Sequence, residues 1–302
     1  MQQAIEPIAR ENSDVTAGML TLEAPAKINW FLNVLGKRED GYHDIVSLMQ
    51  CITLSDSLVL EESSTVEVST HADIPREGNL VYKAARLMRE KAGIASGVKI
   101  TLHKEIPLAA GLGGGSSDAA AALMGLRRLW DLDLTQNEVA GLGELLGSDV
   151  PFFFRGPASL VEGRGEVVSP VEIRRSYPLL IVKPEISISA AWAYSEYDRV
   201  SPPSEVLTKK HNNIKLFSQA LEKGDFEILS FVQGNDLESI AVGRYPVIGE
   251  IKRGLMRRGA LFSSMSGSGS AVFGVFGTER DAEKAREYMS PHWCRVVRTI
   301  IH

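Results

Sequence analysis

The chain of 302 residues contains only two cysteines, Cys51 and Cys294, and neither belongs to a closely spaced pair. Two thiols so far apart form neither a disulfide framework nor a cysteine-based zinc site, so we expect both to be reduced. No apolar run approaches the roughly 18 residues that a membrane-spanning helix needs. The N-terminus lacks the apolar segment of a secretory signal. We therefore expect a cytoplasmic protein without a membrane partner, with residues 1–18 as an N-terminal extension.

An excess of charge of either sign is also missing. The sequence has 33 basic and 38 acidic side chains, which gives a formal net charge of -5. A mildly acidic protein has no electrostatic reason to bind nucleic acid. No spacing of His, Cys, Asp and Glu residues is typical of a metal cage, so we expect no metal held by the protein alone.

The length is more than one hydrophobic core needs and is ordinary for two domains. Apolar periodicity predicts strands and helices that are mixed along the chain, which favours an α+β fold. We expect a first domain over residues 19–175 and a second over residues 176–302. The expected strands cover residues 65–70, 97–103, 178–183, 271–276 and 294–301, and the expected helices cover residues 79–93, 135–147, 247–259 and 278–289, with another after residues 111–115.

A glycine-rich segment over residues 107–118 reads PLAAGLGGGSSD and runs directly into a helical pattern. Glycines let backbone N–H groups crowd around an anion, and the start of a helix adds partial positive charge. We expect a phosphate-binding loop here, with Ser116 or Ser117 as the helix N-cap. A flexible Gly/Ser turn is disfavoured, because a linker would not lead into a helix with Leu123, Leu126 and Trp130 in register.

This loop does not match the best-known phosphate-binding patterns. The P-loop places a Lys directly before Ser or Thr, where this chain has Gly115. The dinucleotide pattern needs a third glycine, where this chain has Ser116. The His-Arg-Asp and Asp-Phe-Gly signatures of protein kinases are absent. The sequence therefore predicts a phosphate loop of another type.

A second run of small residues, at positions 265–270, reads MSGSGS between two apolar segments. Taken alone, it is compatible with a plain hairpin turn. It is equally compatible with a second loop that closes over a triphosphate, through Gly267 and Ser268. Its occurrence together with the first glycine-rich segment favours the second interpretation.

Three polar positions each have an ordinary and a functional interpretation. Lys27 and Asn29 fall on one face of a predicted strand, where a lysine flanked by apolar residues commonly snorkels to the surface. Asp149, two residues before Pro151, suits either a helix N-cap or a general base for an alcohol. Tyr42 and His43 are either exposed loop residues or a stacking and hydrogen-bonding pair for a planar heterocycle.

The motifs occur in a characteristic order. The segments PAKINWFLNVLGKREDGYHDI, PLAAGLGGGSSDAAAAL, GSDVPFFF, GPASLVEGRGE, NDLE and MSGSGSAVF follow one another along the chain. Over roughly residues 20–300 the sequence resembles the GHMP kinases. PAKIN together with DGYH is similar to the members that act on a cytidylylated sugar alcohol of the non-mevalonate route to isoprenoid precursors. The resemblance implies a first domain like domain 2 of ribosomal protein S5 and a ferredoxin-like second domain.

The resemblance also implies roles for particular residues. Lys27 and Asp149 correspond to the catalytic pair. The substrate would be 4-CDP-2-C-methyl-D-erythritol, with ATP as co-substrate and Mg²⁺ held mainly through the nucleotide phosphates, in a monomer or a homodimer. The residues implied to bind the substrate are Asn29, Tyr42, His43 and Tyr194. Those implied to bind ATP are Pro107, Leu108, Ala109, Ala110, Gly111, Leu112, Gly113, Gly114, Gly115, Ser116, Ser117, Asn79, Lys104, Gly267 and Ser268.

One departure from the family pattern precedes Tyr194. The family usually has Val-Ser-Thr-Ala where this chain has Ile188-Ser-Ala-Ala191, so Ala190 removes a hydroxyl. Two other functions stay open at this stage. One is a GHMP kinase that acts on a different alcohol, and the other is a nucleotide-binding protein of this fold that transfers no phosphate.

Overall fold

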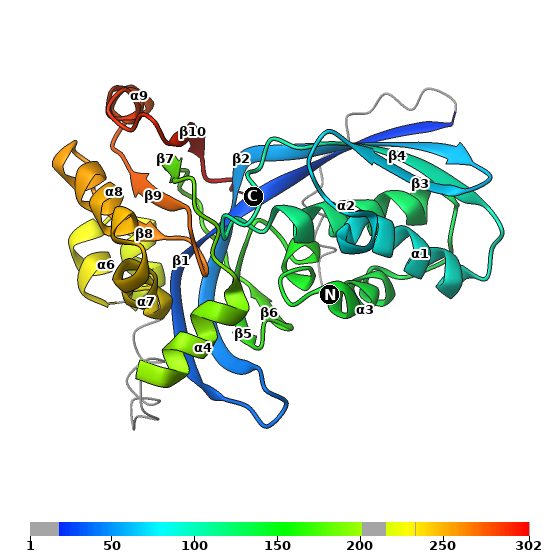
Figure 1. The fold of residues 1–302 in the computed structure, drawn as a ribbon, viewed down its shortest axis with the longest axis horizontal. Helices are drawn as coiled ribbons and strands as arrows, with labels where there is room; N and C mark the ends of the chain where they lie inside the picture. Colours follow the sequence, from blue (N-terminus) through cyan, green and yellow to red (C-terminus); the bar gives the residue numbers. More distant parts are fainter. Residues whose placement is uncertain (1–17, 201–215, 233, 302) are drawn as a thin grey trace. The chain divides into compact units, whose positions relative to one another are not determined.

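The computed structural model describes residues 18–200, 216–232 and 234–301, so the expected N-terminal extension lies outside it apart from Gly18. The chain folds as two units, each built from separate stretches of sequence (Figure 1). Unit 1 contains the residues up to Ala26, Leu54–Pro107 and Gly113–Pro157, and unit 2 contains Lys27–Thr53, Leu108–Leu112 and the residues from Ala158 onward. The long strands β1 (Met19–Lys37) and β2 (His43–Ser63) thus contribute to both units. The division of sequence domains at residue 175 stays a prediction.

Unit 1 combines three helices with the first part of β1 and the last part of β2. Strand β4 (Gly97–His103) pairs antiparallel with residues 57–63 of β2 and parallel with β3 (Val66–Thr70). The helices are α1 (Leu80–Ala92), α2 (Gly114–Leu129) and α3 (Gln136–Leu146), which lie side by side in Figure 1. Two short 3-10 helices, η1 (Arg76–Gly78) and η2 (Pro151–Phe154), complete the unit.

Close packing places α2 at the centre of unit 1. Its residues 119–122 are all alanines and all buried. Further along, a Cβ built at Gly125 would lie 2.4 Å from Leu22 Cδ1 and 2.8 Å from Leu60 Cδ2, so only glycine fits there without a shift. The small residues of this helix therefore let the long strands approach its axis.

Local sequence signals explain where the helices of unit 1 begin and end. The Asn79 side chain caps α1, and Gly93 ends that helix in the left-handed conformation with a φ of 63°. Thr135 and Glu138 form the capping box that the sequence predicts for α3. These predicted boundaries are confirmed, because each depends on residues within one helical turn.

Unit 2 contains a four-stranded antiparallel sheet in the order β10-β7-β9-β8. Its strands are β7 (Pro178–Lys183), β8 (Phe262–Met265), β9 (Val272–Val275) and β10 (Trp293–Arg298). Two further strands, β5 (Ala158–Gly163) and β6 (Val167–Pro170), pair with each other, and β5 pairs with residues 45–50 of β2. The helices are α4 (Ala190–Val200), α6 (Phe226–Val232), α7 (Asp236–Arg244), α8 (Pro246–Arg257) and α9 (Glu279–Arg286).

Strands β7, β8 and β9 of the four-stranded sheet are buried on both faces, whereas the edge strand β10 is partly exposed. Leu180 and Val182 of β7 join a core with Ile248 and Leu255 of α8. On the other face, the Trp30 ring of β1 makes an edge contact with Phe273 at 5.8 Å between centroids. Strand β1 is thereby fixed against the sheet, and this fixes the direction of its polar side chains.

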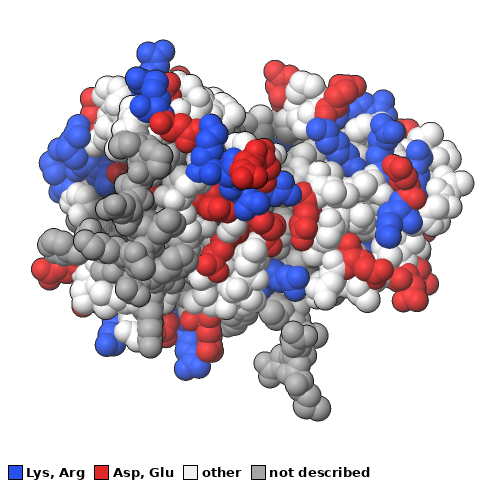
Figure 2. All heavy atoms as spheres, turned by 90° about the horizontal axis from the view of Figure 1, so that it is seen from below, with Lys and Arg blue, Asp and Glu red and all other residues white. Residues whose placement is uncertain are grey.

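Charged side chains of both signs are interspersed on the face that Figure 2 shows. Cys51 and Cys294 are free thiols, and burial raises the pKa of Cys294 to about 11 and that of Cys51 further. None of the helices in the described ranges is both long and apolar enough to cross a bilayer.

Candidate active site

Lys27 and Asn29 lie on one face of β1, as their spacing predicts. The Lys27 side chain is only 2% exposed, and its Nζ donates a hydrogen bond of 2.6 Å to Asn29 Oδ1. Asn29 Nδ2 donates to Ser47 Oγ at 2.8 Å, and Ser47 Oγ donates to the carbonyl of Phe31 at 2.6 Å. A snorkelling lysine would keep its ammonium in water, so that interpretation of Lys27 is wrong. A buried ammonium instead needs polar partners, and Asn29 supplies one of them.

Both glycine-rich segments reach this lysine within unit 2. The backbone N–H of Lys27 donates to Leu112 O at 2.9 Å, and that of Ala271 donates to Ala110 O at 3.0 Å. Ser266 Oγ donates to Gly111 O at 2.9 Å and accepts from the Asn29 N–H at 3.3 Å. Residues 108–112 and the loop over 265–270 are thus joined to each other and to β1.

Two glycines make this approach possible. Gly111 has a φ of +75°, and a Cβ at that position would lie 2.1 Å from Ser266 O. Gly267 has a φ of +56°, and its Cβ would lie 3.2 Å from Asn29 Oδ1 and 3.4 Å from Lys27 Nζ. The loop over 265–270 is a hairpin connection, since Met265 pairs with Val272. Through Gly267 it also lies beside the Lys27 ammonium.

The loop over 265–270 is held by residues to which the sequence assigns no role. Asn235 Nδ2 donates to the carbonyls of Met265 at 2.9 Å and Gly267 at 2.7 Å. Glu238 Oε2 accepts from the Met265 N–H at 2.9 Å, and Lys252 forms an ion pair with Glu238. The sequence offered one signal for Asn235 and Glu238, because the NDLE segment at 235–238 is one of the motifs that carry the resemblance.

A second cluster in unit 2 brings His43 and Tyr194 together. Their rings stack with centroids 4.8 Å apart and planes 20° apart. His43 Nε2 lies 2.6 Å from Asp198 Oδ1, and Lys37 Nζ lies 2.7 Å from Asp198 Oδ2. Burial raises the pKa of Asp198, but the bonds from Lys37 and His43 outweigh it and leave the pKa below its usual value. An ionised Asp198 therefore orients His43, a role absent from the sequence-based assignment.

Tyr42 belongs to the turn between β1 and β2 and presents its ring outward. The side chain is 52% exposed, and its backbone N–H donates to Asp40 Oδ1 at 3.1 Å. The guanidinium of Arg164 lies 5.2 Å from the ring centroid. Tyr42 thus offers an accessible aromatic face with a cation on it.

Helix α2 (Gly114–Leu129) begins three or four residues earlier than an N-cap at Ser116 or Ser117 would imply. Its N-cap is Gly113, with a φ of 70° and no side-chain cap, so the expectation of Ser116 or Ser117 as N-cap is wrong. Glycine adopts this left-handed conformation without steric cost, so the chain turns into the helix before the serines. The first N–H groups of a helix have no partner inside the helix, and here no side chain caps them. This start retains the properties that favour anion binding.

Lys104 lies in a buried ionic cluster of unit 1. Its Nζ is 2.7 Å from Asp118 Oδ2 and also pairs with Asp56, while Asp56 Oδ1 accepts the backbone N–H groups of Glu105 at 2.6 Å and Ile106 at 2.8 Å. Burial raises the pKa of Asp118 to about 8 despite Lys104, and the Asp56 carboxylate adds to the rise. Lys104 therefore has two carboxylate partners, and its expected place near adenine stays a prediction.

Asn79 has a local role as a helix cap, whereas Asp149 does not occupy the N-cap position that its spacing suggested. Asn79 Oδ1 accepts the Val81 N–H at 2.9 Å as the cap of α1. The residue at the N-cap of η2 is Val150, without a side-chain cap, so the capping interpretation of Asp149 is wrong. Asp149 belongs to unit 1 and Lys27 to unit 2, and their catalytic pairing stays a prediction.

Comparisons with known protein families test the resemblance that the motifs indicate. Residues 79–157 match the family described as GHMP kinases N terminal domain, and residues 210–294 match GHMP kinases C terminal. A 4-diphosphocytidyl-2-C-methyl-D-erythritol kinase of Thermodesulfovibrio yellowstonii is 49% identical over 94% of this chain and 99% of its own length. The chain belongs to the GHMP kinases. The resemblance inferred from the motifs is confirmed.

Other relatives of this GHMP kinase carry the same description. The enzyme of Caldanaerobacter subterraneus subsp. tengcongensis, also named 4-diphosphocytidyl-2-C-methyl-D-erythritol kinase, is 43% identical over 88% of this chain and 90% of its own length. Within the GHMP kinases, the chain therefore belongs with the 4-diphosphocytidyl-2-C-methyl-D-erythritol kinases.

Solved structures confirm the two-domain α+β fold of this GHMP kinase. A crystal structure of 4-(cytidine 5'-diphospho)-2C-methyl-D-erythritol kinase matches with a TM-score of 0.75 and 32% identity, over 92% of this chain and 98% of the other. Homoserine kinase from Cytophaga hutchinsonii has a TM-score of 0.72 at 19% identity, over 95% and 96% of the two chains. The second likeness supports the fold alone, since its identity is low.

Proposed function

We propose that this GHMP kinase transfers the γ-phosphoryl group of ATP to the 2-hydroxyl of 4-CDP-2-C-methyl-D-erythritol. The product is 4-CDP-2-C-methyl-D-erythritol 2-phosphate, an intermediate of the non-mevalonate route to isoprenoid precursors. The relatives at 49% and 43% identity bear the name of this activity. The observation that carries the proposal is the buried Lys27 ammonium, fixed by Asn29 beside both glycine-rich loops.

The proposed phosphate site uses backbone groups. The first N–H groups of α2 and the small residues at 111–115 would hold the β- and γ-phosphate oxygens, because N–H donors and the helix dipole both favour negative charge. A Cβ at Gly111 would collide with Ser266 O, which is consistent with a loop that needs its backbone uncovered. ATP is the donor that kinases of this family use.

The proposed chemistry places two side chains at the reacting hydroxyl. Asp149 accepts the proton of the substrate hydroxyl, and Lys27 offsets the negative charge that develops on the transferred phosphoryl group. Phosphoryl transfer depends mainly on positioning and electrostatics, which suits a lysine fixed by Asn29. Mg²⁺ would neutralise phosphate charge as part of the nucleotide complex. Among the described residues there is no cluster of three His, Cys, Asp or Glu side chains suited to a metal.

The proposed cytidine site is the cluster of His43 and Tyr194 together with Tyr42. An exposed aromatic ring can stack on a pyrimidine, and an oriented imidazole can form a directional hydrogen bond with its edge. Asp198 supplies that orientation through its 2.6 Å contact with His43 Nε2. A simple alcohol such as homoserine or mevalonate would leave these groups unused, which favours the cytidylylated substrate.

The direct test is incubation of the protein with ATP, Mg²⁺ and 4-CDP-2-C-methyl-D-erythritol, with the product identified by phosphorus NMR. We expect a new phosphomonoester signal together with ADP. Homoserine, mevalonate and galactose serve as competing acceptors in a coupled assay. A preference for one of these would replace the proposed substrate within the same family, and nucleotide binding without any product would indicate a non-catalytic nucleotide-binding protein.

A further inference from the structure

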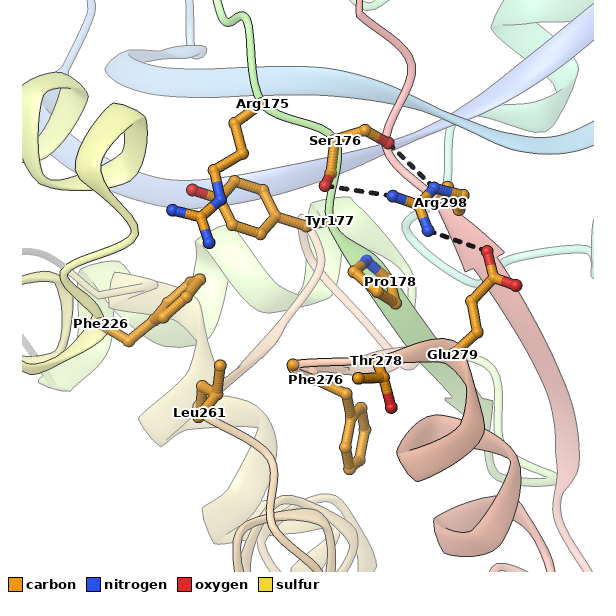
Figure 3. A pocket seen from close by; sticks show the side chains of 11 residues that line it. Arg175, Ser176, Tyr177, Pro178, Phe226, Leu261, Phe276, Thr278, Glu279 and Arg298 are labelled. Carbon is orange, nitrogen blue, oxygen red and sulfur yellow. Dashed lines mark hydrogen bonds and ion pairs between the residues drawn. The ribbon is translucent and has the colours of Figure 1, made fainter.

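A cavity opens in unit 2, away from the residues assigned to catalysis and substrate. It has a volume of about 420 Å³ and lies where the start of β7, the end of β9, the first turn of α9 and the end of β10 meet (Figure 3). None of its lining residues belongs to the candidate active site. Its volume falls within the range typical of small-molecule sites.

The floor of the cavity is apolar and aromatic. Phe226, Leu261 and Phe276 line one side, and in Figure 3 they lie below the two arginines of the cavity. Leu261 is 45% exposed although it is a large aliphatic residue, whereas Phe276 is buried. The Tyr177 ring packs edge-on against Phe226 at 5.3 Å between centroids. A ligand with a ring or a short hydrocarbon chain would cover this surface.

One polar edge of the cavity is already paired. Arg298 Nη1 donates to Glu279 Oε1 at 2.9 Å, and Arg298 Nε donates to Ser176 Oγ at 3.2 Å. Ser176 Oγ in turn donates to Thr299 O at 2.7 Å. These bonds fix the Arg298 guanidinium and balance its charge with that of Glu279.

Arg175 differs from Arg298, because it has no carboxylate partner among the described residues. Its Nη1 donates to the carbonyl of Lys223 at 3.1 Å, and its Cζ lies 5.3 Å from the centroid of the Tyr177 ring. A Cβ at Gly224 would lie 2.4 Å from Arg175 Nη1, so glycine there makes room for the guanidinium. Arg175 is thus held beside the cavity with guanidinium N–H groups to spare.

We propose that this cavity binds a small organic anion, whose acidic group contacts Arg175 and whose ring or short hydrocarbon chain lies against Phe226, Leu261 and Phe276. A free inorganic anion would leave the apolar floor uncovered, and a neutral apolar molecule would leave the guanidinium without an anion. A cation would face repulsion from Arg175. The ligand class is therefore an aryl or short alkyl carboxylate or phosphate monoester.

The test uses phenyl phosphate as the probe, titrated into the full-length protein by calorimetry in the presence of saturating ADP, which occupies the nucleotide site. We expect binding at one site, with phenol and inorganic phosphate each binding at least about tenfold more weakly, because each makes only half of the contacts. Benzoate, which keeps the ring and an acidic group, is expected to compete with phenyl phosphate. Absence of binding at millimolar phenyl phosphate would overturn the proposal.

Two variants connect binding to this cavity. Arg175→Gln is expected to weaken phenyl phosphate binding about tenfold or more, since a charge-assisted contact is lost. Leu261→Asp changes an exposed residue at the floor and is expected to weaken binding similarly. Arg257→Gln, an exposed arginine of α8 outside the cavity, is the matched control. Unchanged kinase turnover in all three variants verifies folding, and unchanged phenyl phosphate affinity in Arg175→Gln would overturn the proposal.

Discussion

Lys27 Nζ donates a 2.6 Å hydrogen bond to the side-chain oxygen of Asn29, two residues further along β1. The amide that accepts this bond is itself fixed by Ser47, so the position of the ammonium is set by a chain of hydrogen bonds within unit 2. A lysine side chain has four rotatable bonds, and this arrangement removes much of that freedom. The pair therefore fixes a positive charge beside the two glycine-rich loops.

Asn29→Ala tests the orienting role of the amide. We expect kcat/KM to fall by about tenfold or more, because a hydrogen bond to a charged group is worth about 1.5–3 kcal/mol. A coupled assay of ADP release measures the effect. Ser47→Ala, which leaves the bond between Lys27 and Asn29 in place, should have a smaller effect. Equal losses in the two variants would contradict a specific role for the contact with Lys27.

Asp149→Ala tests the proposed general base. We expect kcat to fall by about 10²–10⁴, with the KM for ATP nearly unchanged, because the carboxylate acts on the hydroxyl and not on the nucleotide. Steady-state kinetics with varied ATP separates the two parameters. Glu144→Ala, an exposed acidic residue of α3, is the control and should retain wild-type turnover. Near-normal turnover of Asp149→Ala would remove Asp149 from the mechanism.

The sequence predicts most element positions because their signals are local. Thr135 and Glu138 lie three residues apart and form the expected capping box, and Thr278 caps α9 as expected. The wrong prediction of Ser116 or Ser117 as the N-cap of α2 also has a local cause. Serine is a good N-cap, but Gly113 can enter the helix from a left-handed conformation that precedes both serines.

The partners of the site residues could not be predicted in the same way. Asp198 lies 155 residues from His43, and Asp56 lies 48 residues from Lys104. Such contacts depend on how strands pair in space, and an isolated aspartate in a helix or strand carries no mark of its distant partner. The resemblance to the family implies which residues contact ligands, whereas the contacts of Asp198 with His43 and of Asp56 with Lys104 follow from the fold.

Two glycine substitutions separate folding from phosphate binding. Gly115→Ala should be tolerated by the fold, since a Cβ there would meet only Leu80 Cδ1 at 3.7 Å. We expect it to raise the KM for ATP several-fold, because the methyl group would cover backbone at the start of α2, while the thermal unfolding midpoint stays unchanged or rises.

Gly111→Ala should behave differently. A Cβ there would lie 2.1 Å from Ser266 O, on a residue with a φ of +75°. We expect a lower unfolding midpoint together with lost activity, since both the contact and the backbone conformation disfavour alanine. Gly36→Ala, with nothing within 4 Å of the added Cβ, is the control for stability. A wild-type KM for ATP in Gly115→Ala would contradict the assignment of the loop.

His43 and Asp198 provide a test of cytidine recognition. We expect His43→Ala to raise the KM for the cytidylylated substrate about tenfold, with a smaller change in kcat, because a contact to a non-reacting part of the substrate is removed. Asp198→Asn should produce a weaker effect of the same kind, since the amide retains an acceptor but loses the charge that orients the imidazole. Glu185→Gln, an exposed acidic side chain of the same unit, should leave both constants unchanged. A pure kcat effect in His43→Ala would place the imidazole at the reacting atoms instead.

Asp118 makes stability depend on pH in a direction that its pKa fixes. The pKa is about 8 in the folded protein, against an ordinary value of 3.8, because the side chain is buried near Asp56. Between about pH 4 and pH 8 the folded state keeps a proton that the unfolded state has released, so this contribution to stability is fully present below about pH 4 and is lost as the pH rises toward 8. Within this range the free energy of unfolding falls by up to about 1.4 kcal/mol per pH unit.

Asp118→Asn removes this titration and keeps the shape of the side chain. We expect the variant to gain stability relative to the wild type as the pH rises from 5 to 8, and the difference to become constant above about pH 9. Urea unfolding at pH 5, 6.5, 8 and 9.5 measures it. Asp133→Asn, at an exposed position of the same unit, should follow the wild-type curve throughout. Parallel curves for Asp118→Asn and the wild type would mean that Asp118 is already ionised in the folded state over this pH range, which would contradict its raised pKa.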